Sequence, residues 1–305
     1  MKINLLFLFL ATFSFGQYKR ADFNLVGKVK SLQSVTKSYY NPNETAVSGF
    51  LDSEQFDSVY WEFNEKGGII LSENYSDYRG KLGVFDKTIY HYNFSNQIEK
   101  VETILIQNGE EPRKITQKKK FYYIKNQLVR IDEFNSGRTT NQFWVANYVY
   151  NVQNHLSEKI FWMEDEIFSK NTYEFDSNFN LLSEKNYHNN GSLGKVILYE
   201  NNKEGQVVKI RTSIGNKETT EIFEYGKFYK NLYETRDENG KIIQTERYDE
   251  MGWLTEVQKF NYKIQKVDNY SFIFEFDKNN NWIQCEISKN KHPVYLIQRK
   301  ITYFK

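Results

Sequence analysis

The stretch Trp61-Glu62-Phe63-Asn64-Glu65-Lys66-Gly67-Gly68-Ile69 contains a pattern that recurs along the chain. Two aromatic residues two positions apart are followed by Asp or Asn, then by Gly or Asn three places later, and finally by an apolar residue. Aromatic residues at this spacing lie on one face of a strand. Asp or Asn accepts hydrogen bonds from the backbone that follows it, and Gly or Asn adopts a left-handed conformation at low cost. The stretch therefore predicts a strand, a type I turn closed by a left-handed residue, and a return strand.

The turn-opening residue of this pattern recurs at positions 64, 93, 124, 151, 176, 202, 226, 249 and 277, and the copy at 176 carries Phe179 in place of Gly or Asn. Other turn signals lie between the copies: Asp77 to Gly80, Asn108-Gly109, Asn135-Ser136-Gly137, Glu164-Asp165-Glu166, Asn189-Asn190-Gly191, Ile214-Gly215-Asn216 and Asp237 to Gly240. Turns at this spacing predict strands of about ten residues. We therefore expect an all-β fold, an antiparallel β-meander of about nine hairpin repeats and roughly twenty strands. This meander is expected to form a curved open or partly closed sheet.

The first residues predict an export signal. Lys2 precedes the apolar run Leu5–Leu10, and small residues follow up to Gly16. These features are typical of a secretory signal peptide over residues 1–16, with a buried N-terminal strand as the alternative. Residues 17–305 are then one domain, exported to the periplasm or the cell exterior. No later segment is long and apolar enough for a helix that crosses a bilayer, so the sequence predicts a soluble chain with no membrane span.

The composition limits the classes of partner that the chain is expected to bind. Lys and Arg number 41 against 39 Asp and Glu, and loss of Lys2 with the leader leaves 40 against 39. A balance this even gives no reason to expect nucleic acid. The single Cys285 cannot form an internal disulfide and is predicted to be a packed hydrophobic residue. A mean hydropathy of −0.71 with 17% aromatic residues favours many strands that each have one wet face.

The repeat resembles the Rhs/YD-repeat superfamily, whose units carry a Tyr-Asp-x-x-Gly-x-Leu core. The matching residues are Tyr248-Asp249-Glu250-Met251-Gly252-Trp253-Leu254, Phe276-Asp277 with Asn280 and Trp282, and Tyr150-Asn151 with Asn154 and Leu156. The opening Gly27–Ser31 is also similar to the start of exported YD-like proteins from Bacteroidetes. The resemblance implies antiparallel strands wound into curved sheets or shells, with carbohydrate binding in some members and a toxin in others. This chain departs from the toxin-carrying form, because nothing after Phe276 looks like a separate effector domain.

The aromatic pairs admit two interpretations, a core ladder across neighbouring strands or a stacking platform for a flat ligand. Trp144, Trp162 and Trp253 lie outside the pattern and are the ligand-binding candidates. The four histidines show no metal-ligand spacing. Asp176–Asn180 and Asp277–Asn281 resemble the start of a calcium loop but lack its later ligands. The sequence therefore predicts no catalytic residue, no cofactor and no metal site.

Arg113-Lys114 and Lys118-Lys119-Lys120 form the one basic cluster. Alternation along a strand divides Lys118 and Lys120 from Lys119. A solvated or edge-protecting role is expected, with contact to an anionic surface as the alternative.

These observations predict a non-enzymatic exported binding or structural repeat protein. Its partner would be a glycan or a protein that docks on a face or an edge of the sheet. Two alternatives remain, a carbohydrate-active enzyme with cross-strand carboxylates and an accessory or immunity protein of a toxin system. The sequence leaves the oligomeric state open.

Overall fold

A computed structural model describes residues 25–39, 58–78, 81–106, 115–136, 141–227, 229–262 and 264–305. The predicted signal peptide, the Asn108-Gly109 turn signal and Arg113-Lys114 lie outside these ranges. Twenty strands make up the regular structure: β1 (Val29–Ser38), β2 (Ser58–Phe63), β3 (Ile69–Tyr78), β4 (Lys81–Tyr92), β5 (Ile98–Leu105), β6 (Ile115–Ile124), β7 (Gln127–Ser136), β8 (Asn141–Tyr150), β9 (Leu156–Met163), β10 (Glu166–Phe175), β11 (Leu181–His188), β12 (Leu193–Asn201), β13 (Val207–Ile214), β14 (Lys217–Tyr225), β15 (Lys230–Arg236), β16 (Ile242–Tyr248), β17 (Leu254–Asn261), β18 (Lys266–Phe276), β19 (Trp282–Lys289) and β20 (His292–Tyr303). In the described ranges, no helix has the length and apolar character needed to cross a membrane.

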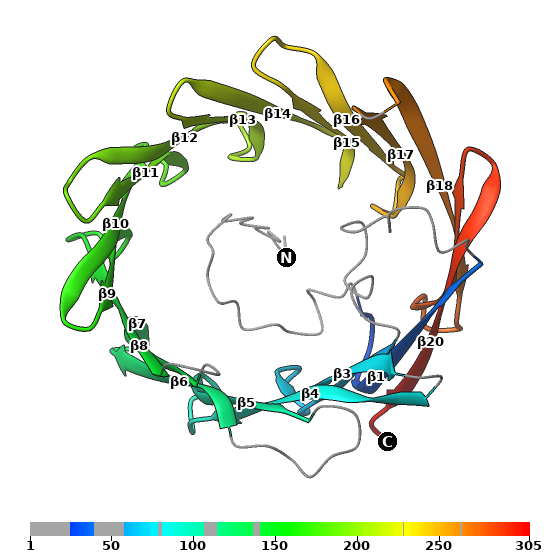
Figure 1. Ribbon diagram of the computed structural model, residues 1–305, viewed down its shortest axis with the longest axis horizontal. Helices are drawn as coiled ribbons and strands as arrows, with labels where there is room; N and C mark the ends of the chain where they lie inside the picture. The colour runs from blue at the N-terminus through cyan, green and yellow to red at the C-terminus, as the bar shows by residue number, and fades with distance from the viewer. Residues whose placement is uncertain are drawn as a thin grey trace, which may run out of the picture. The chain divides into compact units, whose positions relative to one another are not determined.

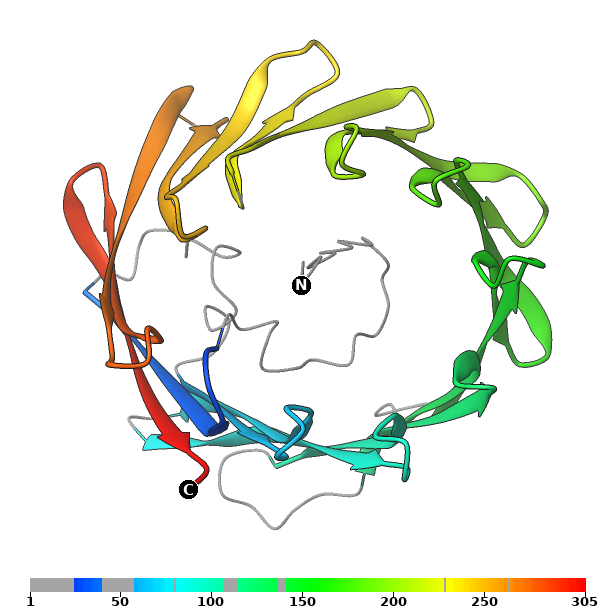
Figure 2. The ribbon, with the colours of Figure 1, turned by 180° about the vertical axis from the view of Figure 1, so that it is seen from behind.

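The strands form one hydrogen-bonded sheet in which chain neighbours pair antiparallel, as in β3–β4 and β13–β14 (Figures 1 and 2). The structure is therefore all-β with twenty antiparallel strands, and it is not the sheet of about nine hairpin repeats that the sequence predicts. β1 pairs with β2 on one side and with β20 on the other. The prediction of an open or partly closed sheet is wrong, because the first and last strands are hydrogen-bonded to each other and the strand order is closed. The turn pattern locates reversals of the chain but carries no information on whether the terminal strands meet.

The closed strand order corrects two predictions about partners. Docking through the edge of a terminal strand is not available, because β1 and β20 use their outer backbone groups on each other. The exclusion of a membrane span was also wrong, since it considered only long apolar runs. A closed antiparallel sheet satisfies its backbone groups between its own strands and needs no such run to cross a bilayer.

The turns have the geometry that the sequence pattern predicts. In the first of them, Gly67 N donates to Asn64 O at 2.9 Å and Asn64 N donates to Gly68 O at 2.8 Å. Asn64 Oδ1 accepts from Gly68 N at 2.9 Å, and Gly67 has a φ of 88°. The same backbone bonds close the turns that open at Asn93, Asn151, Asp176, Asn202, Asp249 and Asp277. The segments resembling calcium loops are therefore turns.

Two copies of the pattern differ from the others. β6 and β7 are joined by only two residues, Lys125 and Asn126, and both have positive φ. Positive φ at both central residues is what a two-residue type I′ hairpin turn requires. Gly226 N donates to Tyr229 O in the turn that precedes β15. Turns with the same backbone bonds as the Asn64 turn also open at His188 and Asp237, at the opposite ends of the strands.

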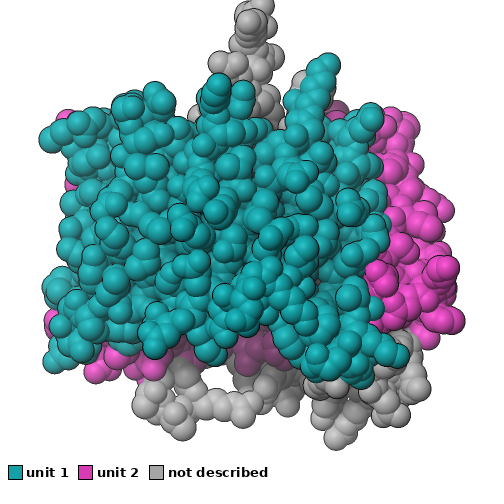
Figure 3. Space-filling model, turned by 90° about the horizontal axis from the view of Figure 1, so that it is seen from above, with its two compact units in different colours: residues 1–16, 148–162, 166–267 teal, residues 17–147, 163–165, 268–305 magenta. Residues whose placement is uncertain are grey.

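The chain divides into two compact units (Figure 3). Among the described residues, one unit holds residues 148–162 and 166–267, which include strands β10 to β17. The other holds residues up to 147, residues 163–165 and residues 268–305, which include β1 to β7 and β19 to β20. The extent of a single domain over 17–305 stays a prediction.

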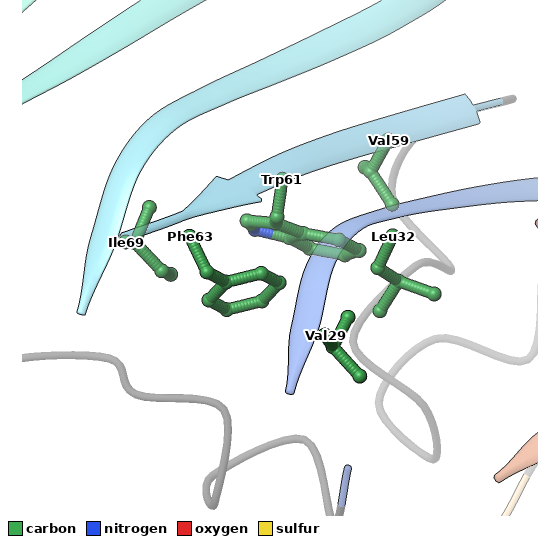
Figure 4. Packing of buried hydrophobic residues seen from close by; sticks show 6 residues of the cluster. All are labelled: Val29, Leu32, Val59, Trp61, Phe63 and Ile69. Carbon is green, nitrogen blue, oxygen red and sulfur yellow. The ribbon is translucent and has the colours of Figure 1, made fainter. Parts of the chain in front are cut away.

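The second unit has a hydrophobic core where its first strands meet. The cluster comprises Val29, Leu32, Val59, Trp61, Phe63 and Ile69 (Figure 4). Four partly buried residues pack against it: Leu25, Tyr90, Ile301 and Tyr303. Leu32 lies opposite both Trp61 on β2 and Ile301 on β20. The core therefore joins the closing pair of strands to the first repeat. Cys285 is fully buried opposite Ile297, in agreement with the packed residue expected there.

Asn281 ties the beginning of the described chain to its end. Its Oδ1 accepts from Val26 N at 2.6 Å, and its Nδ2 donates to Val26 O at 2.9 Å and to the Tyr303 hydroxyl at 2.8 Å. Tyr303 donates in turn to Asp277 Oδ2. We call these hydrogen bonds of Asn281 to Val26 and Tyr303 the clasp. Asn281 is 1% exposed, so the clasp is a buried polar network whose groups are hydrogen-bonded.

The second aromatic residue of the pattern links successive repeats. Tyr92 Oη donates to Ile69 O at 2.7 Å, Tyr123 Oη to Ile98 O at 2.8 Å and Tyr225 Oη to Val207 O at 2.9 Å. Each acceptor is the first residue after the turn of the preceding repeat. These tyrosines therefore have a structural role, as the core-ladder interpretation expects.

The basic cluster is divided between the two faces, as predicted. Lys119 lies opposite Val101 and Glu133, whereas Lys118 lies opposite Glu102 and Phe134. A solvated role is wrong for Lys119, which is buried with its Nζ 3.3 Å from Glu133 Oε2. Burial lowers the pKa of Lys119, and the Glu133 carboxylate opposes that shift.

Candidate ligand-binding site on strands β10 to β16

One face of strands β10 to β16 combines tyrosines with carboxylates. Cross-strand register places Tyr173 opposite Glu184 and Tyr233 opposite Glu246. Ile210 lies between Tyr199 and Glu221, opposite both. We call this the polar-aromatic face and define it by Tyr173, Glu184, Tyr199, Glu221, Tyr233 and Glu246. All six belong to one compact unit.

The opposite face of the same strands is different in character. It carries cross-strand ion pairs, with Lys185 Nζ 2.8 Å from Glu174 Oε1 and an Arg247 nitrogen 3.6 Å from a Glu256 oxygen. These pairs are at least half exposed on one partner, and such pairs contribute little to stability. They have the character of a solvated surface, whereas the polar-aromatic face holds its carboxylates beside tyrosine rings.

Tyr199 is the most informative residue of that face. Its side chain is 5% exposed, and its hydroxyl is buried with no hydrogen-bond partner. Burial raises the pKa of Tyr199, and Glu184, Tyr173 and Glu221 raise it further through their charges. Leaving a buried hydroxyl unpaired costs roughly 1–3 kcal/mol. A buried unpaired hydroxyl of this kind marks a place where a bound water or a ligand would complete the hydrogen bonding.

Glu184 beside it is held by a chain of amides. Asn171 Nδ2 donates to Glu184 Oε1 at 2.9 Å, and Asn186 Nδ2 donates to Asn171 Oδ1 at 2.7 Å. Burial raises the pKa of Glu184, while Lys195, Asn171 and Lys159 act in the opposite direction. The carboxyl group is therefore oriented in advance and has a second oxygen for a ligand.

Glu221 and Glu246 are oriented by hydroxyl and amide groups. Tyr233 Oη donates to Glu221 Oε2 at 3.1 Å and accepts from Thr235 Oγ1 at 2.9 Å. Glu246 accepts from Gln244 Nε2 at 2.8 Å and from the Tyr248 hydroxyl. Each carboxylate thus has a fixed position and is bordered by an aromatic ring.

Lysines balance the charge of these three glutamates. Lys230 Nζ lies 3.9 Å from Glu246 Oε2 and 4.3 Å from the centre of the Tyr248 ring, and burial lowers its pKa. Lys159 and Lys195 act on Glu184 through their charges. With three carboxylates and three ammonium groups, the face is near neutral and suits a neutral polar ligand. Within the described ranges, no three His, Cys, Asp or Glu residues are arranged to hold a metal ion.

The three tryptophans named from the sequence do not lie together. Trp144 is half-buried on β8, four residues before Tyr148 and hence on the same face. Lys159 Nζ lies over the rings of Tyr148 and Phe161, at 5.2 and 4.6 Å, so Phe161 lies on the same face of the sheet as Tyr148. Side chains alternate along a strand, so Trp162 lies on the opposite face. Trp253 is half-buried in the turn between β16 and β17. Ligand binding by these residues stays a prediction.

Tyr199 was not singled out by sequence reasoning, because it is an ordinary first aromatic of the repeat. One signal was available: the residue two places later is Asn201 where most other copies have a second aromatic. Asn201 Nδ2 donates to Leu181 O at 3.0 Å and so replaces the tyrosine link between repeats. The unpaired state of the Tyr199 hydroxyl depends on the side chains that the neighbouring strands place around it, and it is not readable from the sequence.

The buried tyrosines predict loss of stability at high pH. Burial is the main cause that raises the pKa of Tyr92, Tyr173 and Tyr233 to about 12. Unfolded tyrosine ionises near pH 10, so the stability that these protonated hydroxyls contribute is present below about pH 10 and lost as pH rises through about 12. Lys119 and Lys230 have lowered pKa values and act in the opposite sense, but only below the unfolded lysine pKa of about 10.4. We expect the urea midpoint of unfolding to fall steadily as the pH rises above about 10.4, and we expect tyrosinate absorbance to appear as the chain unfolds. A urea midpoint that stays constant up to about pH 12 would contradict this assignment.

Comparison with known proteins identifies no family. No protein-family model and no curated protein matches the chain. Among solved structures, a porin-like protein from Bacteroides uniformis matches with 8% identity and a TM-score of 0.36, over 91% of this chain and 99% of that one. A porin-like protein from Bacteroides vulgatus matches with 10% identity and a TM-score of 0.25, over 92% and 99%. The TcdB2-TccC3 structure matches with 8% identity and a TM-score of 0.31, over 85% of this chain and 20% of that chain. At these values the likenesses establish neither a family nor a function.

Proposed function

We propose that the chain is a non-enzymatic exported binding protein and that its polar-aromatic face binds a neutral glycan. The observation that carries the proposal is the buried Tyr199 hydroxyl with no partner between the carboxylates of Glu184 and Glu221. A sugar hydroxyl is both donor and acceptor, so it pairs with a tyrosine hydroxyl and a carboxylate at once.

The other groups of the face match the same ligand. Tyrosine rings present flat apolar surfaces with a polar end, which suits the C–H face of a pyranose ring. The amides of Asn171, Asn186 and Gln244 add donors and acceptors at fixed positions. The balance of Glu and Lys disfavours a strongly charged ligand such as a nucleic acid.

The test compares two tyrosines of the repeat, one with an unpaired hydroxyl and one whose hydroxyl is hydrogen-bonded. Residues 17–305 and their variants are titrated calorimetrically with neutral hexasaccharides of glucose, mannose and galactose, selected first on a glycan array. Tyr199→Phe is expected to weaken binding about tenfold, the loss of roughly one good hydrogen bond to a ligand. It should leave the free energy of unfolding unchanged or raise it by about 1 kcal/mol, because it removes a buried unpaired group.

The matched control is Tyr225→Phe on β14. Its hydroxyl donates to Val207 O at 2.9 Å, so this variant should lose about 0.5–1.5 kcal/mol of stability and keep wild-type affinity. If no neutral hexasaccharide binds, or if both variants bind as tightly as wild type, the proposal is wrong.

A second function is favoured by one observation, the raised pKa of Glu184 in a cross-strand carboxylate row. A buried carboxyl with a raised pKa is the form that a general acid of glycoside hydrolysis takes. Release of new reducing ends from a bound hexasaccharide, abolished in Glu184→Gln, would identify an enzyme instead of a binding protein.

A further inference from the structure

Phe179 has a backbone conformation that its side chain disfavours. Its φ is 68°, in the left-handed region, where a bulky residue is a genuine outlier. It is the fourth residue of the turn that opens at Asp176. In the described turns of this kind, every other residue at this position is Gly or Asn: Gly67, Asn96, Asn154, Gly191, Gly205, Gly240, Gly252 and Asn280. A residue kept against such a cost is a candidate for a function other than folding.

The Phe179 ring is held in one orientation by the preceding hairpin. It stacks on His155 with ring centres 4.3 Å apart and planes 18° apart, and His155 also lies 5.4 Å from Phe175. Phe179 nevertheless remains 52% exposed, and Val152, in the turn that carries His155, is 93% exposed. One side of the ring is thus supported while much of its surface meets solvent.

This exposed ring lies at the turn end of the hairpin that begins the polar-aromatic face. Phe175 and Leu181 are the last pair of β10 and β11 before the turn. Tyr173 and Glu184, the next pair on the same face, already belong to the proposed glycan site. Phe179 therefore lies just beyond the turn end of the two strands that carry Tyr173 and Glu184, in the same unit of the chain.

We propose that Phe179, oriented by its stack on His155, is a stacking subsite for a pyranose ring at the turn end of the glycan site. The proposal rests on the proposed function. A rigid exposed ring binds a flat apolar surface with little loss of conformational entropy, which explains why the turn carries Phe instead of Asn.

The test replaces Phe179 with the residue that the turn prefers. Phe179→Asn is expected to weaken calorimetric binding of the hexasaccharide that binds wild type best by about tenfold, the effect of removing one ring contact. Its melting temperature should stay unchanged or rise by about 2–4 °C, because Asn adopts the left-handed conformation more readily. Phe94→Asn is the matched control: Phe94 is fully exposed in the turn between β4 and β5, in the other unit, and its loss should leave binding unchanged.

The outcomes separate this inference from the function on which it rests. If Tyr199→Phe weakens binding and Phe179→Asn does not, the stacking subsite is wrong and the glycan site stands. A melting temperature that falls in Phe179→Asn, with affinity retained, would assign the ring to packing on His155. If wild type binds none of the hexasaccharides, both proposals are wrong.

Discussion

Phe63→Ala is expected to lower the free energy of unfolding by about 3–5 kcal/mol, the cost of removing a buried phenylalanine and leaving a cavity. Phe63 is 1% exposed and lies opposite Ile69 at the end of the first described hairpin. The cluster around it contains Leu32 of β1, and β1 pairs with β20. The cavity therefore weakens the packing of the strands that close the sheet.

The measurement is the urea midpoint followed by tryptophan fluorescence, with Phe94→Ala as the control. Phe94 directly follows the turn-opening Asn93, and its side chain is fully exposed. Its removal should change stability by no more than about 0.5 kcal/mol. Equal losses in the two variants would contradict the core assigned to Phe63.

Asn281→Ala is the second change with a large expected effect. The side chain holds both backbone groups of Val26, at 2.6 and 2.9 Å, and the Tyr303 hydroxyl at 2.8 Å. Alanine leaves those groups unpaired in a buried position, and we expect a loss of about 2–4 kcal/mol. The amide of Val26 should lose its protection against hydrogen exchange before the other described amides do, because its acceptor is gone.

Asn180→Ala is the matched control, since Asn180 has the same place in the turn that opens at Asp176. Its Nδ2 donates to Asp176 Oδ2 at 2.8 Å within its own turn, and it is only half-buried. We expect a loss of about 0.5–1.5 kcal/mol, typical of one hydrogen bond. If the two alanine variants were equally stable, Asn281 would be an ordinary turn residue and not a clasp between the ends of the chain.

The turns were predictable because their determinants are local. An Asp or Asn side chain that bonds the next backbone amides, and a left-handed residue three places later, act within five residues. Asn151, Asp176 and Asp249 all open turns where the pattern expects them. The copy with Phe179 keeps the geometry as well, because Asp176 Oδ1 still accepts from the amides of Asn178 and Asn180, both at 2.8 Å.

The candidate site was less accessible to sequence reasoning. The sequence pointed to tryptophans outside the repeat as ligand-binding candidates. However, Trp162 lies on the face of β9 opposite to Phe161, and Trp253 lies in the turn between β16 and β17. The site residues Tyr173, Tyr199 and Tyr233 are ordinary members of the repeat. Their combination with Glu184, Glu221 and Glu246 depends on cross-strand register, which a single strand's sequence does not state.

The sequence by itself determined where the chain reverses, that its strands are antiparallel neighbours, and that paired aromatics share a face. These properties follow from backbone preferences and from alternation along a strand, both of which act over a few residues. Only the tertiary structure decided that β1 meets β20, that Asn281 holds Val26, and that a tyrosine hydroxyl lies unpaired beside two carboxylates. Those features join residues that are far apart in the sequence, for example 271 positions in the Ser31–Thr302 hydrogen bond, and they depend on register and packing over many strands.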